Sequence, residues 1–442
     1  MEMKELSSVL QQNGVVGAGG AGFPTYAKLD ERAETIILNC AECEPLLRLH
    51  RQLLEKHAYE IMSTFYLIAE TVGAKEAIIG IKKAYKKTIE ALEANISAFP
   101  NMKIGLLDEV YPAGDEVVLI YEVTGKVVKP GSIPIESGVA VFNVETVYNL
   151  YRALHDQHPV VDKLVSVVAE VNNPVTVRVP LGTTIDEVVA LAGGATIPDP
   201  VYFMGGPMMG YIGSGQDVVT KTTNAVLVLP EDHLIIQKKK GKAKVDLARA
   251  AASCCQCSMC TDLCPRHALG HPIEPHLFMR AATCKDIQEP EIFINTLFCS
   301  SCGLCEMYSC FQGLSPRTLM AEYKGGLRSA GVKVPKVEPA PVEASREYRK
   351  IPMERLMSRL GLTKYNVDAP LHDDTVYMKR VKIMLRQHIG APAQPVVAVG
   401  DSVTMGQVIA APAKGLSVAI HASISGKVIE VNNNFIIIDA NN

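Results

Sequence analysis

The first third of the chain alternates between helix-like and strand-like patterns of apolar residues. Apolar side chains recur at helical spacing over 54–72, and Gly73 follows, so the pattern predicts a helix that ends at this glycine. The residues on this face are Leu54, Ala58, Ile61, Phe65, Ile68 and Val72. An apolar run at 77–81, a second helical stretch through Thr88, Leu92 and Ile96, and another apolar run at 103–107 come next. A strand, a helix and a strand in this order predict parallel pairing with a right-handed crossover.

From residue 164 the pattern changes to short strands. Apolar runs at 165–171 and 175–179 flank Asn172-Asn173-Pro174, residue types that favour a hairpin turn. Thr184 is followed three residues later by Glu187, which is the pattern of a capping box, and Gly193-Gly194 favour the end of that helix. With further strands at 201–204 and 226–229, this segment is typical of a small β-grasp module.

The rest of the chain contains a cysteine-rich part, a linker and a β-rich end. Residues 333–344 are rich in Pro, Val, Lys and Glu, as linkers are, and the end of the chain alternates Val and Ile between glycines, which predicts a small all-β sandwich. We therefore predict a multidomain α/β and β protein. Its parts are an α/β domain at 1–162, a β-grasp domain at 163–240, short helices around the cysteines at 241–330, a linker at 331–372 and a β sandwich at 373–442.

Composition and charge place the chain among ordinary globular proteins. Hydrophobic residues make up 48% and charged residues 21%, and the formal net charge of −3 gives no general attraction to nucleic acid or anionic lipid. No apolar stretch reaches the roughly 18 residues of a membrane span, and polar residues near Met1 argue against a signal peptide. We expect a soluble, intracellular protein. A lysine run at 238–242 is interpreted as a solvated linker, with a docking patch for an acidic partner as the alternative.

Eight cysteines form two groups, at 254–264 and 299–310. In each group three cysteines stand at i, i+3 and i+6, and a fourth follows. This spacing is typical of ferredoxins with two [4Fe–4S] clusters, in which the fourth cysteine of each run binds the other cluster. We therefore assign one cluster to Cys254, Cys257, Cys260 and Cys310, and the second to Cys299, Cys302, Cys305 and Cys264.

Zinc and disulfides are the alternatives for these cysteines. A structural zinc site uses separated pairs of ligands, which leaves the third cysteine of each run without a role, and cysteines packed so closely along the chain are poor partners for disulfides. The second run is irregular, because four residues precede Cys310 and Phe311 replaces the usual proline. Of the remaining cysteines, Cys255 and Cys284 are interpreted as packing residues; Cys40 and Cys43 have the spacing of a redox pair.

A glycine-rich loop and an acidic strand end are the other chemical motifs. Residues 17–25 read Gly-Ala-Gly-Gly-Ala-Gly-Phe-Pro-Thr, and their bare backbone can approach a phosphate or a ring closely, with Lys28 nearby. A dinucleotide fingerprint is weakly supported here, because scarcely any strand precedes the loop and Pro24 interrupts the start of a helix. An apolar strand then ends in Asn39-Cys40-Ala41-Glu42-Cys43-Glu44-Pro45, where amide and carboxylate groups can accept hydrogen bonds from ligand hydroxyls.

Two further clusters, Tyr111-Pro112-Ala113-Gly114-Asp115-Glu116 and Asn143-Val144-Glu145-Thr146, complete a recognisable order of motifs. In this order they resemble the flavin-binding subunit family of respiratory complex I, and more specifically the RnfC family of electron-transport proteins and the corrin (cobalamin) reductases of propanediol-utilisation microcompartments. The resemblance covers essentially the whole chain. It implies a complex-I-like FMN-binding α/β domain, an SLBB-type β-grasp domain without a cofactor role, a two-[4Fe–4S] ferredoxin-like domain and a C-terminal barrel-sandwich.

The resemblance also implies which residues surround the cofactors. It places FMN against Gly17, Gly19, Gly20, Gly22, Lys28, Asn39, Glu42, Tyr111, Gly114, Asp115, Asn143 and Thr146, and NADH near Phe23, Glu44 and Glu116. Glu31 stands where complex I has a second aromatic residue for NADH. Cys40 and Cys43 lie inside the acidic loop and are interpreted as loop residues.

The expected activity is electron transfer from NADH through FMN and two clusters to an acceptor, because a flavin accepts two electrons together and passes them on singly. The resemblance implies that the acceptor is cobalamin, a cobalamin-handling adenosyltransferase or another redox protein. An Rnf-like relay protein and an iron–sulfur scaffold without a working flavin site are the alternatives. The resemblance also implies a cytoplasmic protein that a bacterial microcompartment can enclose. The C-terminal sandwich resembles carrier domains, but the surroundings of Lys414 do not match a carrier hairpin.

Overall fold

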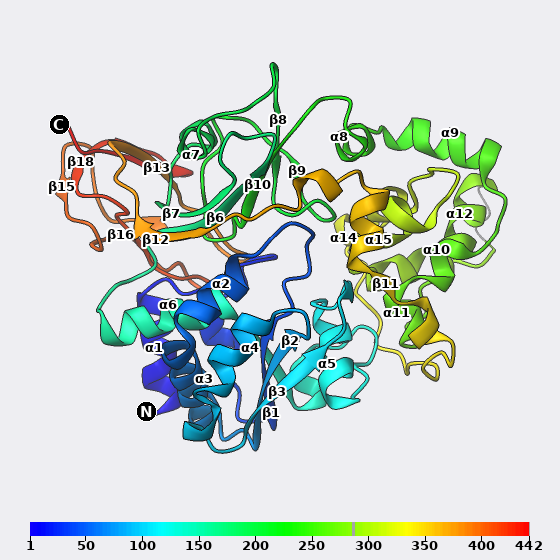
Figure 1. The fold of residues 1–442 in the computed structure, drawn as a ribbon, viewed down its shortest axis with the longest axis horizontal. Helices are drawn as coiled ribbons and strands as arrows, with labels where there is room; N and C mark the ends of the chain where they lie inside the picture. The colour runs from blue at the N-terminus through cyan, green and yellow to red at the C-terminus, as the bar shows by residue number, and fades with distance from the viewer. Residues whose placement is uncertain (285–287, 442) are drawn as a thin grey trace.

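The computed structural model describes residues 1–284 and 288–441, and it begins with a parallel α/β domain (Figure 1). The sheet has the order β3-β2-β1-β5, and all neighbouring strands are parallel, as predicted. The strands are β1 (Thr35–Cys40), β2 (Glu76–Lys82), β3 (Met102–Leu107) and β5 (Val139–Asn143).

Both faces of this sheet are buried, because alternate residues of β1 enter two different cores. Ile36 and Leu38 pack with the side that carries α3 and α6, whereas Ile37 packs with α5. The helices are α1 (Met3–Gln12), α2 (Leu49–Lys56), α3 (Ala58–Val72), α4 (Lys86–Glu93), α5 (Glu116–Thr124) and α6 (Val144–His155). The helix predicted over 54–72 is in fact divided at His57, whose backbone leaves the helical region, and it ends at Gly73 with φ of 73° as predicted.

The β-grasp prediction is confirmed, and the sheet has six strands in the order β12-β7-β6-β10-β8-β9. The hairpin consists of β6 (Asp162–Ala169) and β7 (Val175–Pro180), and the capping box of Thr184 and Glu187 starts α7 (Ile185–Leu191). The other strands of this part are β8 (Val201–Met204), β9 (Tyr211–Ile212) and β10 (Ala225–Leu229).

The segment 331–372 is more than the predicted linker. It contains β11 (Ile351–Pro352), which pairs with β4 (Val110–Tyr111), and α15 (Met353–Arg359). Strand β12 (Leu371–Thr375) begins inside it and extends the β-grasp sheet beside β7. These pairings join residues far apart in sequence, so the local composition that suggested a linker could not reveal them.

Short helices surround the cysteines, as predicted, and pack on a core around Phe278, Met279 and Met320. They are α9 (Ala243–Ser253), α10 (Met259–Asp262), α11 (Pro265–Ala268), α12 (Pro275–Cys284), α13 (Glu291–Ile294) and α14 (Pro316–Ser329). Helix α8 (Leu234–Lys239) precedes them, and its Ile235 and Ile236 belong to the core of the β-grasp part instead. No helix among the described residues is long and apolar enough to cross a membrane.

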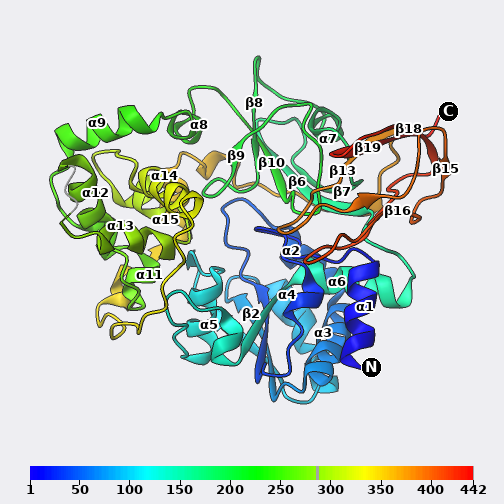
Figure 2. The same ribbon diagram turned by 180° about the vertical axis from the view of Figure 1, so that it is seen from behind.

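Two small sheets form the C-terminal part, which lies beside the β-grasp domain and above α1 and α6 in Figure 2. One has the order β13-β19-β18-β15 and the other β14-β16-β17. The strands are β13 (Arg380–Met384), β14 (Gln394–Pro395), β15 (Ser402–Val403), β16 (Val408–Ala411), β17 (Ile420–His421), β18 (Gly426–Val431) and β19 (Phe435–Asp439). A loop of this part covers the glycine-rich loop, because the N–H of Ile389 donates to the carbonyl of Ala21 at 2.9 Å.

Candidate cofactor-binding site

The two asparagines of the sequence motifs stand side by side at the carboxyl edge of the sheet. Asn39 of β1 is the register partner of Asn143 of β5. The Asn39 amide donates to the carbonyl of Gly114 at 3.1 Å, and a Cβ on Gly114 would lie only 3.0 Å from the Cβ of Cys43. Asn143 caps α6 by accepting from the N–H groups of Glu145 and Thr146. The carboxyl edge of a parallel sheet is where open α/β folds bind ligands.

The glycine-rich loop is fixed against the first turn of α6. Thr146 accepts the N–H of Ala18 at 2.9 Å and donates to the carbonyl of Val16 at 3.2 Å. Gly20 has φ of +61°, and a Cβ there would meet no atom within 4 Å. Exposed backbone beside a helix N-terminus favours a phosphate group. This loop therefore fits the phosphate end of FMN.

Gly19 and Gly22 face the β-grasp domain, whereas Gly17 faces its own loop. A Cβ on Gly22 would lie 2.7 Å from the Cγ2 of Thr222, and one on Gly19 would lie 3.0 Å from the side-chain nitrogen of Asn224. Gly17 donates its N–H to the carbonyl of Phe23 at 2.9 Å, which closes the loop. The β-grasp domain thus contacts the loop that the resemblance assigns to FMN.

Lys28 and Glu116 lie together at the open side of this region. The Lys28 ammonium donates to the carbonyl of Val141 at 2.9 Å and is 3.7 Å from a carboxylate oxygen of Glu116. Phe23 remains 37% exposed, so its ring is accessible to a planar ligand. These three positions can contact a nucleotide that enters from solvent.

Asp115 is committed to protein partners. Its carboxylate caps α5 by accepting from the N–H groups of Val117 and Val118, and it forms an ion pair of 3.0 Å with Arg266. Arg266 belongs to α11, directly after Cys264-Pro265. Asp115 therefore links the α/β domain to the cysteine-rich domain.

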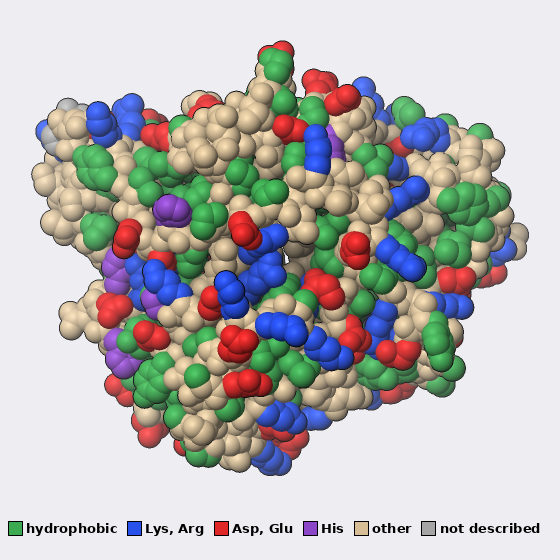
Figure 3. Space-filling view, in the orientation of Figure 1, with side chains coloured by type: hydrophobic (Ala, Val, Ile, Leu, Met, Phe, Trp, Pro, Cys, Tyr) green, Lys and Arg blue, Asp and Glu red, His purple; other side chains and the backbone are tan. Residues whose placement is uncertain are grey.

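The two carboxylates of the acidic loop point in different directions. Glu42 accepts the N–H of His50 at 2.9 Å, and its other oxygen is buried without a hydrogen bond, 3.6 Å from the Nε of Arg51. A cavity of about 280 Å³ lies beside it, lined also by Lys82 and Tyr85. In Figure 3 the molecule is hollowed near the middle of the face, where acidic and basic side chains gather.

Glu44 is bound by the β-grasp domain. It accepts the N–H groups of Met208 at 2.8 Å and Met209 at 3.1 Å. Burial raises the pKa of Glu44 to about 7, although these two hydrogen bonds favour the ionised form. The β-grasp loop at 205–210 therefore contacts a residue that the resemblance assigns to NADH, where no role near a cofactor was expected of this domain.

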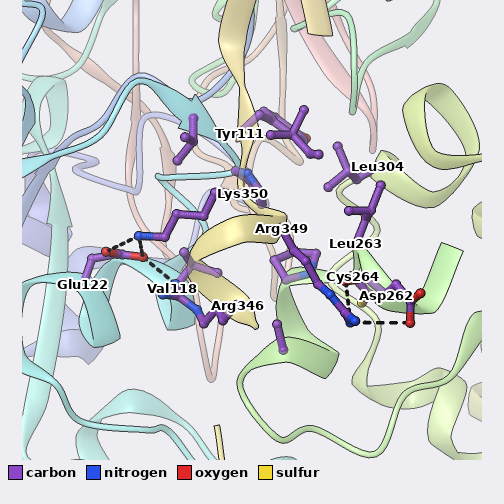
Figure 4. A pocket seen from close by; sticks show the side chains of 15 residues that line it. Tyr111, Val118, Glu122, Asp262, Leu263, Cys264, Leu304, Arg346, Arg349 and Lys350 are labelled. Atoms are coloured by element: carbon purple, nitrogen blue, oxygen red, sulfur yellow. Dashed lines mark hydrogen bonds and ion pairs between the residues drawn. The ribbon is translucent and has the colours of Figure 1, made fainter. Parts of the chain in front are cut away.

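Tyr111 joins the α/β domain to the second group of cysteines. Its ring is buried, and its hydroxyl donates to the carbonyl of Cys302 at 2.6 Å. In Figure 4 the segment 346–351 crosses this junction. Lys350 donates to Glu122 of α5 at 3.2 Å, and Arg349 pairs with Asp262 of α10 at 3.4 Å. The segment 346–351 therefore contacts both the α/β domain, through α5, and the cysteine-rich domain, through α10.

The eight cysteine thiols line two separate cavities. One is lined by Cys254, Cys257, Cys260 and Cys310, with Cys255 in the same lining, and the other by Cys264, Cys299, Cys302 and Cys305. This is the grouping that crossed ligation requires. Among the described residues, no group of three or more Cys, His, Asp or Glu side chains could hold a single metal ion.

Backbone groups around these thiols suit anionic clusters. The N–H of Ser301 donates to the sulfur of Cys299 at 3.3 Å, and that of Leu314 donates to the sulfur of Cys310 at 3.4 Å. Burial raises the pKa of Cys260 to about 12 and that of Cys264 to about 11, so binding of iron has to displace their protons. Four thiols around one cavity, with N–H groups directed at sulfur, fit a [4Fe–4S] cluster.

Several interpretations from the sequence need correction. The lysine run is not a solvated linker throughout, because Lys238 donates to the carbonyl of Gly313 and Lys239 to that of Met208 at 3.3 Å. Cys255 and Cys284 are exposed and do not pack in the core. Cys40 and Cys43 were both interpreted as loop residues, but Cys40 is the last residue of β1 and only Cys43 lies in the loop; both are free thiols.

Sequence reasoning gave no role to several buried residues that hold the site in place. Glu145 of α6 is fully buried and pairs with the buried Lys163 of β6, and His50 lies 3.8 Å from the same carboxylate. Arg266 was missed as well. A lysine inside an apolar strand and an arginine directly after a Cys-Pro pair were the available signals.

Comparison with known proteins extends this description. Four domain families match parts of the chain. They are the Nuo51 FMN-binding domain over residues 10–152, the SLBB domain over 164–212, the 4Fe-4S dicluster domain over 253–315 and the RnfC Barrel sandwich hybrid domain over 368–441. The chain is 40% identical over 430 residues to cobalamin reductase PduS of Salmonella typhimurium, covering 97% of this chain and 95% of that protein.

Two other comparisons are more distant. The C component of the ion-translocating oxidoreductase complex of Edwardsiella ictaluri is 32% identical over 266 residues, which cover 59% of this chain and 32% of that component. A crystal structure of an NAD⁺-reducing [NiFe]-hydrogenase in the H2-reduced state superposes with a TM-score of 0.51 at 20% identity, over 73% of this chain and 63% of the hydrogenase chain. That likeness concerns the fold.

Proposed function

This chain belongs to the family of the cobalamin reductase PduS, and from that premise we propose that it passes electrons from NADH through FMN and two [4Fe–4S] clusters to cob(III)alamin. The observation that carries the proposal is the hydrogen bond of 2.6 Å from Tyr111, at the flavin-side loop, to the carbonyl of Cys302. It joins the predicted flavin site directly to a cysteine of the nearer thiol cavity.

FMN, when bound, supplies the conversion of a hydride into single electrons. The chain's own groups hold and orient it: the glycine-rich loop faces the phosphate, and Asn39 and Asn143 offer amides at the strand ends. Lys28 supplies positive charge beside Glu116. Phe23 and Glu116, at the open side, are proposed to contact NADH.

The thiols are proposed to hold the two clusters in the crossed arrangement. The set of Cys264, Cys299, Cys302 and Cys305 is the one that adjoins Tyr111 and Asp115 through Cys302 and Arg266. Cys257 of the other set is exposed. Electrons therefore enter at the set that contains Cys302 and leave at the set that contains Cys257, which is closer to solvent.

A relay function is the second candidate, because the chain also shares 32% identity with a component of an ion-translocating oxidoreductase complex. In that case a redox protein, or an adenosyltransferase that holds cobalamin, receives the electrons. We also propose that the protein works in the cytoplasm, where a microcompartment can enclose it.

Anaerobic reduction of cob(III)alamin by NADH, followed by absorbance, tests the proposal. The purified protein should form cob(II)alamin without a second protein. Cys257→Ser should abolish this reduction. Cys255→Ser is the control, because Cys255 is also an exposed cysteine and is two residues away, and this variant should still reduce cobalamin. Flavin reduction without cobalamin reduction would instead support the relay function, and failure of NADH to reduce bound FMN would overturn both.

A further inference from the structure

The two thiol cavities differ in the charges around them. The cavity at Cys264, Cys299, Cys302 and Cys305 is also lined by Arg266 and Arg317. The cavity at Cys254, Cys257, Cys260 and Cys310 is lined by no Lys, Arg, Asp or Glu among the described residues. Each cavity has its four assigned thiols, and the cavity at Cys254 also has Cys255 in its lining, so the two linings differ chiefly in the arginines of one of them.

Arg317 has a donor without a partner. It is the second residue of α14, and its Nε is buried with no hydrogen-bond acceptor in the part of the chain that the structure describes. A buried N–H without an acceptor is unfavourable. An inorganic sulfide or a cysteine sulfur of a cluster in the cavity would supply that acceptor.

Arg266 brings a second positive charge to the same cavity. It is held by Asp115, with its Nη2 at 3.0 Å from the carboxylate, so that its position is fixed between α5 and the thiols. The negative charge of Asp115 offsets part of the positive charge of Arg266. The electrostatic potential inside the cavity therefore depends on the other charged side chains nearby.

These other groups leave the balance positive. Lys324 donates to the carbonyl of Cys299, while Glu306 is the nearby carboxylate and accepts the N–H of Thr318 at 2.8 Å. The basic side chains near this cavity are therefore Arg266, Arg317 and Lys324, and the acidic ones are Asp115 and Glu306. Near the other cavity, Lys238 donates to the carbonyls of Gly313 and Leu314.

We propose that Arg266 and Arg317 raise the reduction potential of the cluster at Cys264, Cys299, Cys302 and Cys305 above that of the other cluster. Reduction adds one negative charge to a cluster, and fixed positive charges in a poorly solvated cavity stabilise that charge. The cluster next to the flavin side then retains the first electron and keeps it from returning. This inference rests on the cluster assignment of the proposed function.

A redox titration followed by EPR tests this inference on the anaerobically purified holoprotein. In Arg317→Gln, the reduced-to-oxidised ratio of one cluster at a fixed potential should fall at least tenfold, which is about 59 mV for a one-electron centre. The signal of the other cluster should not shift. Arg317→Lys should restore most of the ratio, because it keeps the charge.

Arg328→Gln is the matched control, since Arg328 is an exposed residue near the end of the same helix, about 16 Å along it. It should shift neither signal. Equal shifts of both clusters in Arg317→Gln, or no shift with full iron content, would overturn the inference and leave the proposed function intact. Absence of iron from the unmodified protein would instead contradict the proposed function itself. If Arg317→Gln fails to assemble its clusters, Arg266→Gln provides the same comparison.

Discussion

Replacing Lys163 by methionine should destabilise the α/β domain far more than any exposed ion pair would. Lys163 is 1% exposed and its partner Glu145 is fully buried. The ammonium contacts the carboxylate and donates to the carbonyl of Leu164 at 3.1 Å, and the other oxygen of Glu145 accepts the N–H of Leu164 at 3.1 Å. This pair fixes the first turn of α6, where Thr146 holds the glycine-rich loop.

The expected loss is about 3–5 kcal/mol, the range for removing one partner of a buried ion pair. Without the ammonium, Glu145 remains as a buried carboxylate with the imidazole of His50 beside it, at 3.8 Å. In the folded protein burial opposes ionisation of Glu145, but Lys163 and His50 outweigh it and lower the pKa to about 2. The pair therefore contributes stability above the unfolded-state pKa of Glu, and this contribution is lost as pH falls toward 2.

Urea unfolding at neutral pH measures the loss. The double variant Lys163→Met with Glu145→Gln should recover most of it, because no uncompensated charge remains and the amide still accepts the N–H of Leu164. Lys103→Met is the control, since Lys103 pairs with Glu76 while 54% exposed, and it should change the unfolding free energy by less than about 1 kcal/mol. A loss below 1 kcal/mol for Lys163→Met, or a double variant as unstable as the single one, would refute this reasoning.

Tyr111→Phe should lower the unfolding free energy by about 1–3 kcal/mol, because it leaves the buried carbonyl of Cys302 without its donor, and it should slow cluster reduction in stopped-flow measurements. The difference in unfolding free energy between the unmodified protein and Glu44→Gln should fall as pH rises from about 4.5 through 7, because the pKa of Glu44 is raised in the folded protein. A difference that does not change with pH would contradict this. Gly22→Ala should destabilise more than Gly20→Ala, because both have positive φ but only the first Cβ meets Thr222, as thermal unfolding can show.

Features encoded in short stretches of sequence were predictable. The parallel sheet, the hairpin at 165–179 and the capping box at Thr184 depend on local residue patterns, and the structure has them. The spacing of the cysteines is also local, and the thiols line two cavities in two sets of four. The order of the motifs was sufficient to identify the family.

Features that depend on distant contacts were not predictable. Glu44 binds Met208 across 164 positions, and Asp115 binds Arg266 across 151, so neither partner leaves a mark in the local pattern. Strand β12 joins the β-grasp sheet only because β7 offers an edge to it. A charge that is satisfied by another domain looks, in sequence, like a charge that is free to bind a ligand.

EPR of the anaerobic holoprotein after addition of NADH tests the central claim most directly. The account predicts about eight irons per chain, as two [4Fe–4S] clusters require, and reduced-cluster signals that appear with NADH alone. If dithionite produced these signals and NADH did not, electrons would not pass from NADH to the clusters within this chain, and the account would be wrong.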